Sequence, residues 1–344
     1  MFKRLVKNPS FLIGFTITFS LLLLSILYSV VYEDDIPKVS LMFSEEGEVI
    51  APPYSPLEYP PLGTDNVNRS IFLLIIIGAK YTIGFGLIIT VLRVFPAVLF
   101  GLILHFYFKR FRRMIQPILD AFNYFPPSLL VFLLLEGIFF VGPMMEQNAI
   151  SYGVTEKVII SLIILITISI PSLSLLFSNE YYKIMNNEFI DSAKVLGASK
   201  RHYIMKHIKP FIIPQIILVS IREFMTVLLL IAHLGVLKSF IGGSKRVEDV
   251  FENNVYVPNL NEWSGLLGNW WEFLWTTYPW IPFIPILFIT ITILAAKLML
   301  IGVTKAIEDF QHEKAKETSQ SLQAQTKRKI EGHEDSNLME RISL

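Results

Sequence analysis

The sequence predicts an all-α protein that crosses a membrane about six times. Of its 344 residues, 53% are hydrophobic and only 17% are charged, and the mean hydropathy is +0.52. A water-soluble domain carries about 25% charged residues. Apolar runs of the roughly 20 residues that a helix needs to cross about 30 Å of hydrocarbon recur along the chain. Membrane burial therefore accounts for the composition better than one large soluble core.

Each apolar run marks one expected span. The first follows Lys3, Arg4 and Lys7 and is longer than the apolar region of a signal peptide, which indicates an uncleaved span. The second is the least regular, because residues 71–108 are too many for one straight span, and 71–77 is expected to be an interfacial helix leading into it. The expected spans are residues 11–31, 81–108, 117–141, 158–177, 211–236 and 281–301.

The charges of the connecting segments favour six spans over the alternative of a seventh crossing within the second run. Lys and Arg collect in the short cytoplasmic loops of membrane proteins. Residues 1–10 and 109–113 hold bases and no acids, and 179–210 holds six bases against three acids. The acidic segments are 32–70, with eight acids and two bases, and 237–280, with five acids and three bases. Six spans place every basic segment and both termini in the cytoplasm, whereas seven would place two basic segments outside.

This topology divides the chain into a few units. The outer segment 237–280 contains Trp263, Trp270, Trp271 and Trp275, with Trp280 at its edge, a pattern typical of a belt at the membrane interface. A docking surface for a partner is the alternative. The expected units are 1–70, the first span and a Pro-rich acidic outer segment; 71–309, the transmembrane domain, with a cytoplasmic hairpin at 187–214 and the outer loop 237–280; and 310–344, a polar cytoplasmic tail.

The 187–214 hairpin is the most informative segment. Phe189, Ala193 and Leu196 recur at helical spacing and predict one apolar stripe. Gly197 then suits the left-handed end of this first helix, and Ser199 is a good N-cap for a second, basic helix. Acidic residues in the first turn of the first helix are favoured by its positive end; they are Glu188 and Asp191. Such an amphipathic hairpin is expected to dock onto a soluble partner or to lie on lipid.

The hairpin resembles the EAA loop of the permease subunits of ABC importers, and in particular the peptide/nickel branch. Asp191-Ser192-Ala193 stands where that pattern has E-A-A, Gly197 follows after three residues, and His207-Ile208-Lys209-Pro210 follows after nine more. The resemblance implies that this loop couples the permease to an ATPase subunit. The residues to which it assigns this role are Glu188, Asp191, Ser192, Ala193, Gly197, Ala198 and Pro210.

Four further motifs resemble the same branch in the same order, over about residues 9–309. They are Leu62–Ser70 with Gly78–Ile83; Asp120 with Phe125 and Pro126; Trp263 and Gly265 with Tyr278–Trp280; and Gly302 with Ala306–Glu308. The departures from the family pattern are Asn68, Ser70, Lys80, Ser192 and Lys209. They preserve the sign of charge and the apolar stripe of the hairpin but leave the class of cargo open.

The sequence lacks the motifs of an enzyme. It has no phosphate-binding G-x-x-x-x-G-K-[ST], no H-E-x-x-H and no cysteine, and its six histidines show no metal-ligand spacing. A net charge of +1 does not favour nucleic acid. The chain is therefore expected to bind no cofactor itself. The resemblance implies a homologous second permease, two cytoplasmic ABC ATPases that bind ATP and Mg²⁺, and an extracytoplasmic substrate-binding protein, assembled in a prokaryotic plasma membrane.

Several charges fall inside the expected spans, where they are costly and usually face the bundle interior or a watery path. The central pair on the fifth span, Arg222 and Glu223, is the clearest case, with Arg93 and Glu136 on other spans. Lys297 is close enough to the cytoplasmic end to reach water. Interhelical ion pairs or contacts with a partner subunit are one interpretation, and a polar path for cargo is the other.

The function that these observations favour is a permease subunit that imports peptides, with nickel as the alternative cargo known in the family. A secondary transporter driven by an ion gradient is the main alternative, but such proteins usually show inverted repeats, and none is evident. An intramembrane enzyme would need a paired nucleophile and base in adjacent spans, and no such Ser–His pairing stands out.

Overall fold

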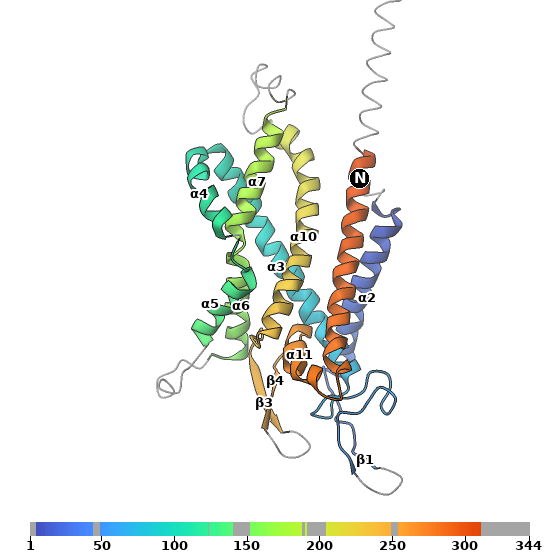
Figure 1. The fold of residues 1–344 in the computed structure, drawn as a ribbon. Helices are drawn as coiled ribbons and strands as arrows, with labels where there is room; N and C mark the ends of the chain where they lie inside the picture. The colour runs from blue at the N-terminus through green and yellow to red at the C-terminus, as the bar shows by residue number, and fades with distance from the viewer. Residues whose placement is uncertain are drawn as a thin grey trace, which may run out of the picture.

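The computed structural model describes residues 5–43, 49–122, 124–139, 152–187, 190, 204–248 and 254–310 as a bundle of helices with two short β-hairpins (Figure 1). The helices are α2 (Pro9–Tyr32), α3 (Ile71–Phe106), α4 (Lys109–Phe122), α5 (Pro127–Phe139), α6 (Val154–Thr167), α7 (Ile170–Met185), α10 (Lys209–Val236), α11 (Trp263–Trp270) and a last helix, Trp280–Phe310. A π-helix, Ile204–Ile208, precedes α10, and a 3-10 helix, Trp271–Trp275, follows α11. The antiparallel pairs are β1 (Met42–Phe43) with β2 (Val49–Ile50) and β3 (Ser244–Glu248) with β4 (Asn254–Pro258).

Five helical segments in the described part of the chain are long and apolar enough to cross a membrane. They are Pro9–Tyr32, Ile71–Phe106, Val154–Met185, Lys209–Val236 and Trp280–Phe310, and α5 is a shorter apolar helix of 13 residues. Together α4 and α5 run the length of the bundle as one further passage (Figure 1). The predicted all-α, polytopic fold is therefore confirmed.

The bundle has two unlike ends (Figure 1). One carries the start of α2, the start of α4, the end of α7, the start of α10 and the end of the last helix; it is called the basic end here, because the 109–113 segment lies there. The other, the strand end, carries both β-hairpins and α11. The first and last described helices thus begin and end on the same side, as an even number of passages requires.

The structure corrects the predicted second span. Ile71–Phe106 is one continuous helix of 36 residues, about 54 Å long, so 71–77 is not a separate interfacial helix. Its first turns are buried at the strand end, where Ile71, Leu74 and Ile75 are at most 2% exposed. The extra length therefore packs against protein instead of lying on the membrane surface.

Prolines break the third and fourth predicted spans. The run 117–141 is divided into α4 and α5 at Pro126 and Pro127, because the residue before a proline is disfavoured in a helix. The run 158–177 is divided into α6 and α7 just before Pro171, which has no N–H to continue the α6 hydrogen bonds.

Tryptophans of the 237–280 segment lie in the core of the strand end, and not only at an interface. Trp263 and Trp270 are fully buried in a cluster with Ile71, Phe224 and Ile281, which belong to α3, α10 and the last helix. Trp275, in contrast, is 83% exposed. The interface-belt interpretation is therefore wrong for Trp263 and Trp270, because α11 folds back against the transmembrane helices.

Candidate functional site: a polar groove in the bundle

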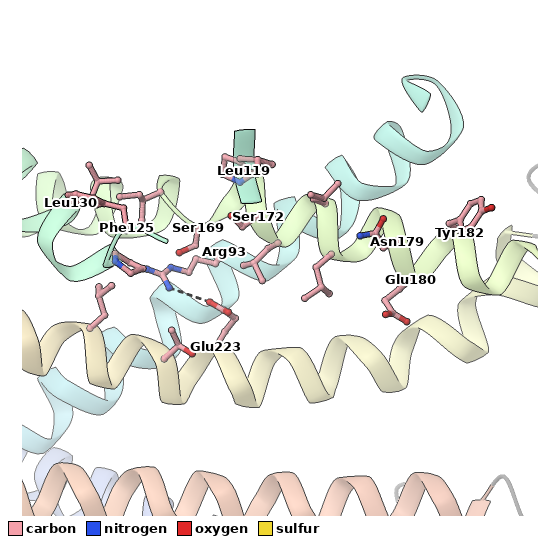
Figure 2. A pocket seen from close by; sticks show the side chains of 18 of the residues that line it. Arg93, Leu119, Phe125, Leu130, Ser169, Ser172, Asn179, Glu180, Tyr182 and Glu223 are labelled. Atoms are coloured by element: carbon pink, nitrogen blue, oxygen red, sulfur yellow. Dashed lines mark hydrogen bonds and ion pairs between the residues drawn. The ribbon is translucent and has the colours of Figure 1, made fainter. Parts of the chain in front are cut away.

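A groove of about 1050 Å³ lies between the α4–α5 passage, α7 and α10 (Figure 2). One wall is formed by Leu119 of α4, Phe125 of the α4–α5 connection and Leu130 of α5, and the other is formed by α7 and by the middle of α10. The groove reaches from the centre of the bundle, at Arg93, toward the basic end, at Lys183. Its place within helices that cross the membrane makes it the candidate functional site.

One face of α7 supplies most of the polar lining. Ser169, Ser172, Asn179 and Lys183 follow one another at intervals of three, seven and four residues, which places them on one helical face. Glu180 lies beside them and forms an ion pair with Lys183, in which Nζ of Lys183 lies 2.8 Å from Oε1 of Glu180. Figure 2 shows Ser169, Ser172, Asn179 and Glu180 spread along this face. The groove thus offers hydroxyl, amide and charged groups at membrane depth, where they are usually functional.

A buried ion pair lies at the inner end of the groove (Figure 2). Arg93 of α3 is fully buried, and its Nη1 lies 3.3 Å from Oε2 of Glu223 on α10. The Glu223 side chain is 16% exposed and faces the groove. The pair joins α3 to α10 across the bundle.

Arg93 also donates hydrogen bonds to a backbone carbonyl near the end of α6, next to the break between α6 and α7. Its Nε donates to the Leu165 carbonyl oxygen at 2.9 Å, and its Nη2 donates to the same oxygen. The last carbonyls of a helix have no partner within the helix, and α6 ends at Thr167. One guanidinium therefore ties together α3, α6 and α10 at the point where the fourth passage bends.

The structure brings together two of the four intramembrane residues predicted from the sequence. Arg93 pairs with Glu223, but Arg222 does not, since neighbouring residues on a helix point about 100° apart. Arg222 is exposed in the middle of α10, and Glu136 is half-buried on α5; neither forms an ion pair among the described residues. Lys297 is exposed on the last helix. The ion pair therefore joins two helices, as one of the two interpretations of these charges expected, and Arg222 takes no part in it.

The predicted coupling residues are mostly outside the described part of the chain. Glu188, Asp191, Ser192, Ala193, Gly197 and Ala198 lie there, whereas Pro210 is in the first turn of α10. The described flanks show that α7 ends and α10 begins at the basic end of the bundle (Figure 1). The 187–214 hairpin therefore connects two helices at that end.

The conserved-domain model of the family described as "Binding-protein-dependent transport system inner membrane component" matches residues 97–309. The chain belongs to this family. The matched part runs from the second half of α3 to the end of the last helix and includes nearly all of the groove lining and the whole 187–214 hairpin. The resemblance to ABC-importer permeases inferred from the sequence motifs is confirmed.

Relatives within this family cover most of the chain. The "Dipeptide transport system permease protein DppC" of Alkalihalophilus pseudofirmus is 24% identical over 312 residues, which are 89% of this chain and 88% of the relative. The "Di/tripeptide transport system permease protein DppC" of Pseudomonas aeruginosa is 22% identical over 247 residues, 72% of this chain and 71% of the relative. The chain is thus a multi-pass inner-membrane transport component and not a catalytic subunit, and the alternative of an ion-driven transporter finds no support.

Family motifs at the strand end of this permease make three separate polar contacts. Asp65 of the Leu62–Ser70 motif is fully buried and holds Arg69, with Oδ2 to Nη2 at 2.7 Å. Lys80 of the Gly78–Ile83 motif donates to Oδ1 of Asp34 at 2.6 Å, which ties α3 to the end of α2. Trp263 donates from its ring to the Ile75 carbonyl oxygen at 2.8 Å. These motifs therefore have a structural role, which is to fasten the outer segments to α3.

The polar stripe of α7 was missed in the sequence, although its spacing was visible there. Ser169, Ser172, Asn179 and Lys183 interrupt an apolar run at helical intervals, which is the signal that could have revealed one polar face. The contact between Arg93 and Leu165 left no such signal, because its acceptor is a backbone carbonyl 72 residues away.

Glu262, at the start of α11, makes the stability of the strand end depend on pH. Its side chain is fully buried, and neither carboxyl oxygen has a hydrogen-bond partner within the described residues. Burial, which outweighs the nearby backbone amides of Glu262 and Ile241, raises the pKa of Glu262 from 4.5 to about 8.

A group with a raised folded-state pKa stabilises the fold fully below its unfolded pKa, and this stability is lost as the pH rises through the folded pKa. We expect the stability of the purified permease to fall between about pH 4.5 and pH 8, by the several kcal/mol that a shift of this size represents, and its apparent melting temperature to fall with it. Glu262→Gln should flatten that pH dependence, whereas Glu272→Gln, on an exposed side chain, should not. Equal pH profiles for the wild type and Glu262→Gln would contradict the prediction.

Proposed function

We propose that this chain is one of two permease subunits of an ATP-driven importer of short peptides, and that the groove is part of the route taken by the cargo. The family match over residues 97–309 carries the proposal, because it spans both the groove and the 187–214 hairpin. Relatives named for dipeptide and di/tripeptide transport support peptides as the cargo and favour them over nickel. The groove has a mostly apolar lining with a row of hydroxyl, amide and charged groups along α7, which suits a cargo that has apolar side chains as well as charges and amides.

The orientation follows from charge. The basic end carries the 109–113 segment and the 179–210 segment, and Lys and Arg collect in cytoplasmic loops. The basic end is therefore cytoplasmic in this proposal, together with both termini, and the strand end is extracytoplasmic. The 187–214 hairpin then faces the ATPases, and the β-hairpins and α11 face a substrate-binding protein.

The second permease is expected along the exposed side of α10. Arg222 is exposed in the middle of a helix that crosses the membrane, and it does not line the groove. Lipid at this depth would be a costly neighbour for an arginine. Contact with the homologous subunit or with the water-filled route between the two subunits provides a polar environment for this face.

Coupling is proposed to act through the 187–214 hairpin. This chain binds no nucleotide in the proposal; ATP and Mg²⁺ are bound by two cytoplasmic ATPases, and their closure moves the hairpin. The displacement would reach α7 and α10, which are continuous with the hairpin and line the groove. The route would thereby open alternately to the two sides of the membrane.

Gly197→Val tests this coupling. Gly adopts the left-handed conformation of a tight turn freely, whereas a side chain there costs on the order of 1–2 kcal/mol, and its bulk collides with a closely fitting partner. We expect normal amounts of the variant in the membrane, with peptide uptake lost and ATP hydrolysis uncoupled from uptake, or with the ATPases released. Asp191→Lys should act in the same direction, because it reverses a charge favoured at a helix start.

A crosslinking experiment provides the control. The chain contains no cysteine, so Ala198→Cys introduces a single thiol, which should crosslink to an ATPase subunit. Ser244→Cys, exposed on β3 at the other end of the bundle, should not. Normal uptake by Gly197→Val together with no crosslink from Ala198→Cys would show that the hairpin does not couple the subunits.

A further inference from the structure

Helix α4 has an exposed side that neither the groove nor the rest of the bundle uses. Arg112 and Leu119 point inward: Leu119 lines the groove, and the Arg112 guanidinium lies 5.2 Å from the centre of the Tyr182 ring on α7. The outward side consists of Arg110, Phe111, Arg113, Met114, Pro117 and Ile118, all of which are exposed. This set is called the α4 outer face below.

Along the axis of this face, both bases lie nearer the basic end than Met114 and Ile118, and Phe111 lies between the two bases. Arg110 and Arg113 lie in the first two turns, nearest the basic end. Met114 and Ile118, which are 68% and 57% exposed, follow toward the middle of the bundle. Eight residues, or about 12 Å of helix, separate Arg110 from Ile118. Acidic side chains are absent from residues 107–119, and none of the ion pairs between described residues involves Arg110 or Arg113.

This order matches the depth profile of one membrane leaflet. A helix that enters the bilayer from its surface passes the headgroups first and the acyl chains about 10 Å later. Exposed arginines at the first level attract anionic headgroups, at about 1 kcal/mol per basic residue. Exposed Met and Ile at the second level are stabilised by acyl chains. A molecule with a negatively charged head and an apolar tail can contact the arginines and the apolar side chains of this face at the same time.

We propose that the α4 outer face binds an anionic phospholipid of the leaflet at the basic end, with its phosphate at Arg110 and Arg113 and its acyl chain along Met114 and Ile118. Because α4 also forms one wall of the groove through Leu119, a lipid bound there would press this wall toward α7. The proposal concerns a surface turned away from the groove and does not depend on the cargo or on the ATPases.

A fluorescence experiment on the full chain tests the proposal. Met114→Cys gives a single thiol in a chain without cysteine, and this thiol is labelled with bimane. The labelled protein is reconstituted in phosphatidylcholine vesicles that contain a minor fraction of either brominated phosphatidylglycerol or brominated phosphatidylcholine. We expect brominated phosphatidylglycerol to quench the label more strongly, and increased salt to weaken that preference, because salt screens exposed charges.

Two charge-matched variants make the test specific. Arg110→Gln/Arg113→Gln should lower the preference for phosphatidylglycerol roughly thirtyfold. Lys245→Gln/Arg246→Gln removes the same charge from exposed residues of β3 at the strand end, and it should leave the preference unchanged. Equal quenching by both brominated lipids, or an equal loss in both double variants, would overturn the proposal. A label that neither lipid can quench would overturn it in favour of a protein partner covering this face.

Discussion

Arg93→Ala should destabilise the permease more than any other single substitution of a charged residue inside its spans. The substitution leaves the half-buried carboxylate of Glu223 without its cation and the Leu165 carbonyl oxygen without its donor. Breaking a buried pair from one side costs about 3–5 kcal/mol in soluble cores, and polar contacts between membrane helices contribute about 1–2 kcal/mol. We expect the apparent melting temperature in detergent to fall on the order of 5–10 °C, with peptide uptake strongly reduced.

Two variants separate the buried pair from charge in general. Arg222→Ala removes a positive charge from the residue next to Glu223, but Arg222 is exposed and lies outside the pair, so the melting temperature of this variant should stay close to that of the wild type. Arg93→Met/Glu223→Met removes both members and should recover part of the loss, because no charge is then left unpaired. The Leu165 carbonyl would still lack its donor, so recovery should be incomplete. Equal stability of Arg93→Ala and Arg222→Ala would show that the pair does not hold the bundle together.

The number of passages could be predicted from the sequence because it depends on two strong signals. Apolar runs and the placement of bases both report on the membrane, and they gave the correct fold class. Helix boundaries depend on subtler causes. Pro126 and Pro171 are helix breakers, but they lie inside apolar runs that are long enough for one span each. The length of these runs therefore predicted continuous helices where the structure has breaks. In α3 the opposite occurred, since the length of the run 71–108 suggested an interruption that the structure does not have.

The sequence does not show which polar side chains pair with one another inside the bundle, because the pairs join residues that are far apart in the chain. Glu223 pairs with a residue 130 positions away and not with its neighbour Arg222. Lys80, which looked costly in a span, is compensated by Asp34 and by the Ser29 hydroxyl at the end of α2. A periodic pattern indicates which side of a helix is polar, but only the packing of helices decides which polar groups meet.

Gly78→Ala should disrupt the strand end, although it adds only one methyl group. A Cβ at this position would lie 2.4 Å from the Asn261 carbonyl oxygen and 2.8 Å from the Trp263 ring, and real Cβ atoms essentially never come closer than 3.0 Å. Asn261 and Trp263 would have to move away from α3. Their displacement breaks the hydrogen bonds from Trp263 to the Ile75 carbonyl oxygen at 2.8 Å and to the Thr82 hydroxyl at 2.9 Å. Overpacking of a tight core costs about 1–3 kcal/mol, and loss of these buried hydrogen bonds adds to it.

Gly84→Ala is a matched control on the same helix. No atom lies within 4 Å of the Cβ that it would add, and Ala is favoured over Gly in a helix interior by up to about 1 kcal/mol. This variant should be as stable as the wild type or slightly more so, while Gly78→Ala melts at a lower temperature and accumulates less in the membrane. If both variants melted together, the approach of α11 to α3 would not be tight. Because the strand end faces the substrate-binding protein in the proposed orientation, the loosened Gly78→Ala variant should also lose stimulation of ATP hydrolysis by that protein before it loses the ATPases themselves.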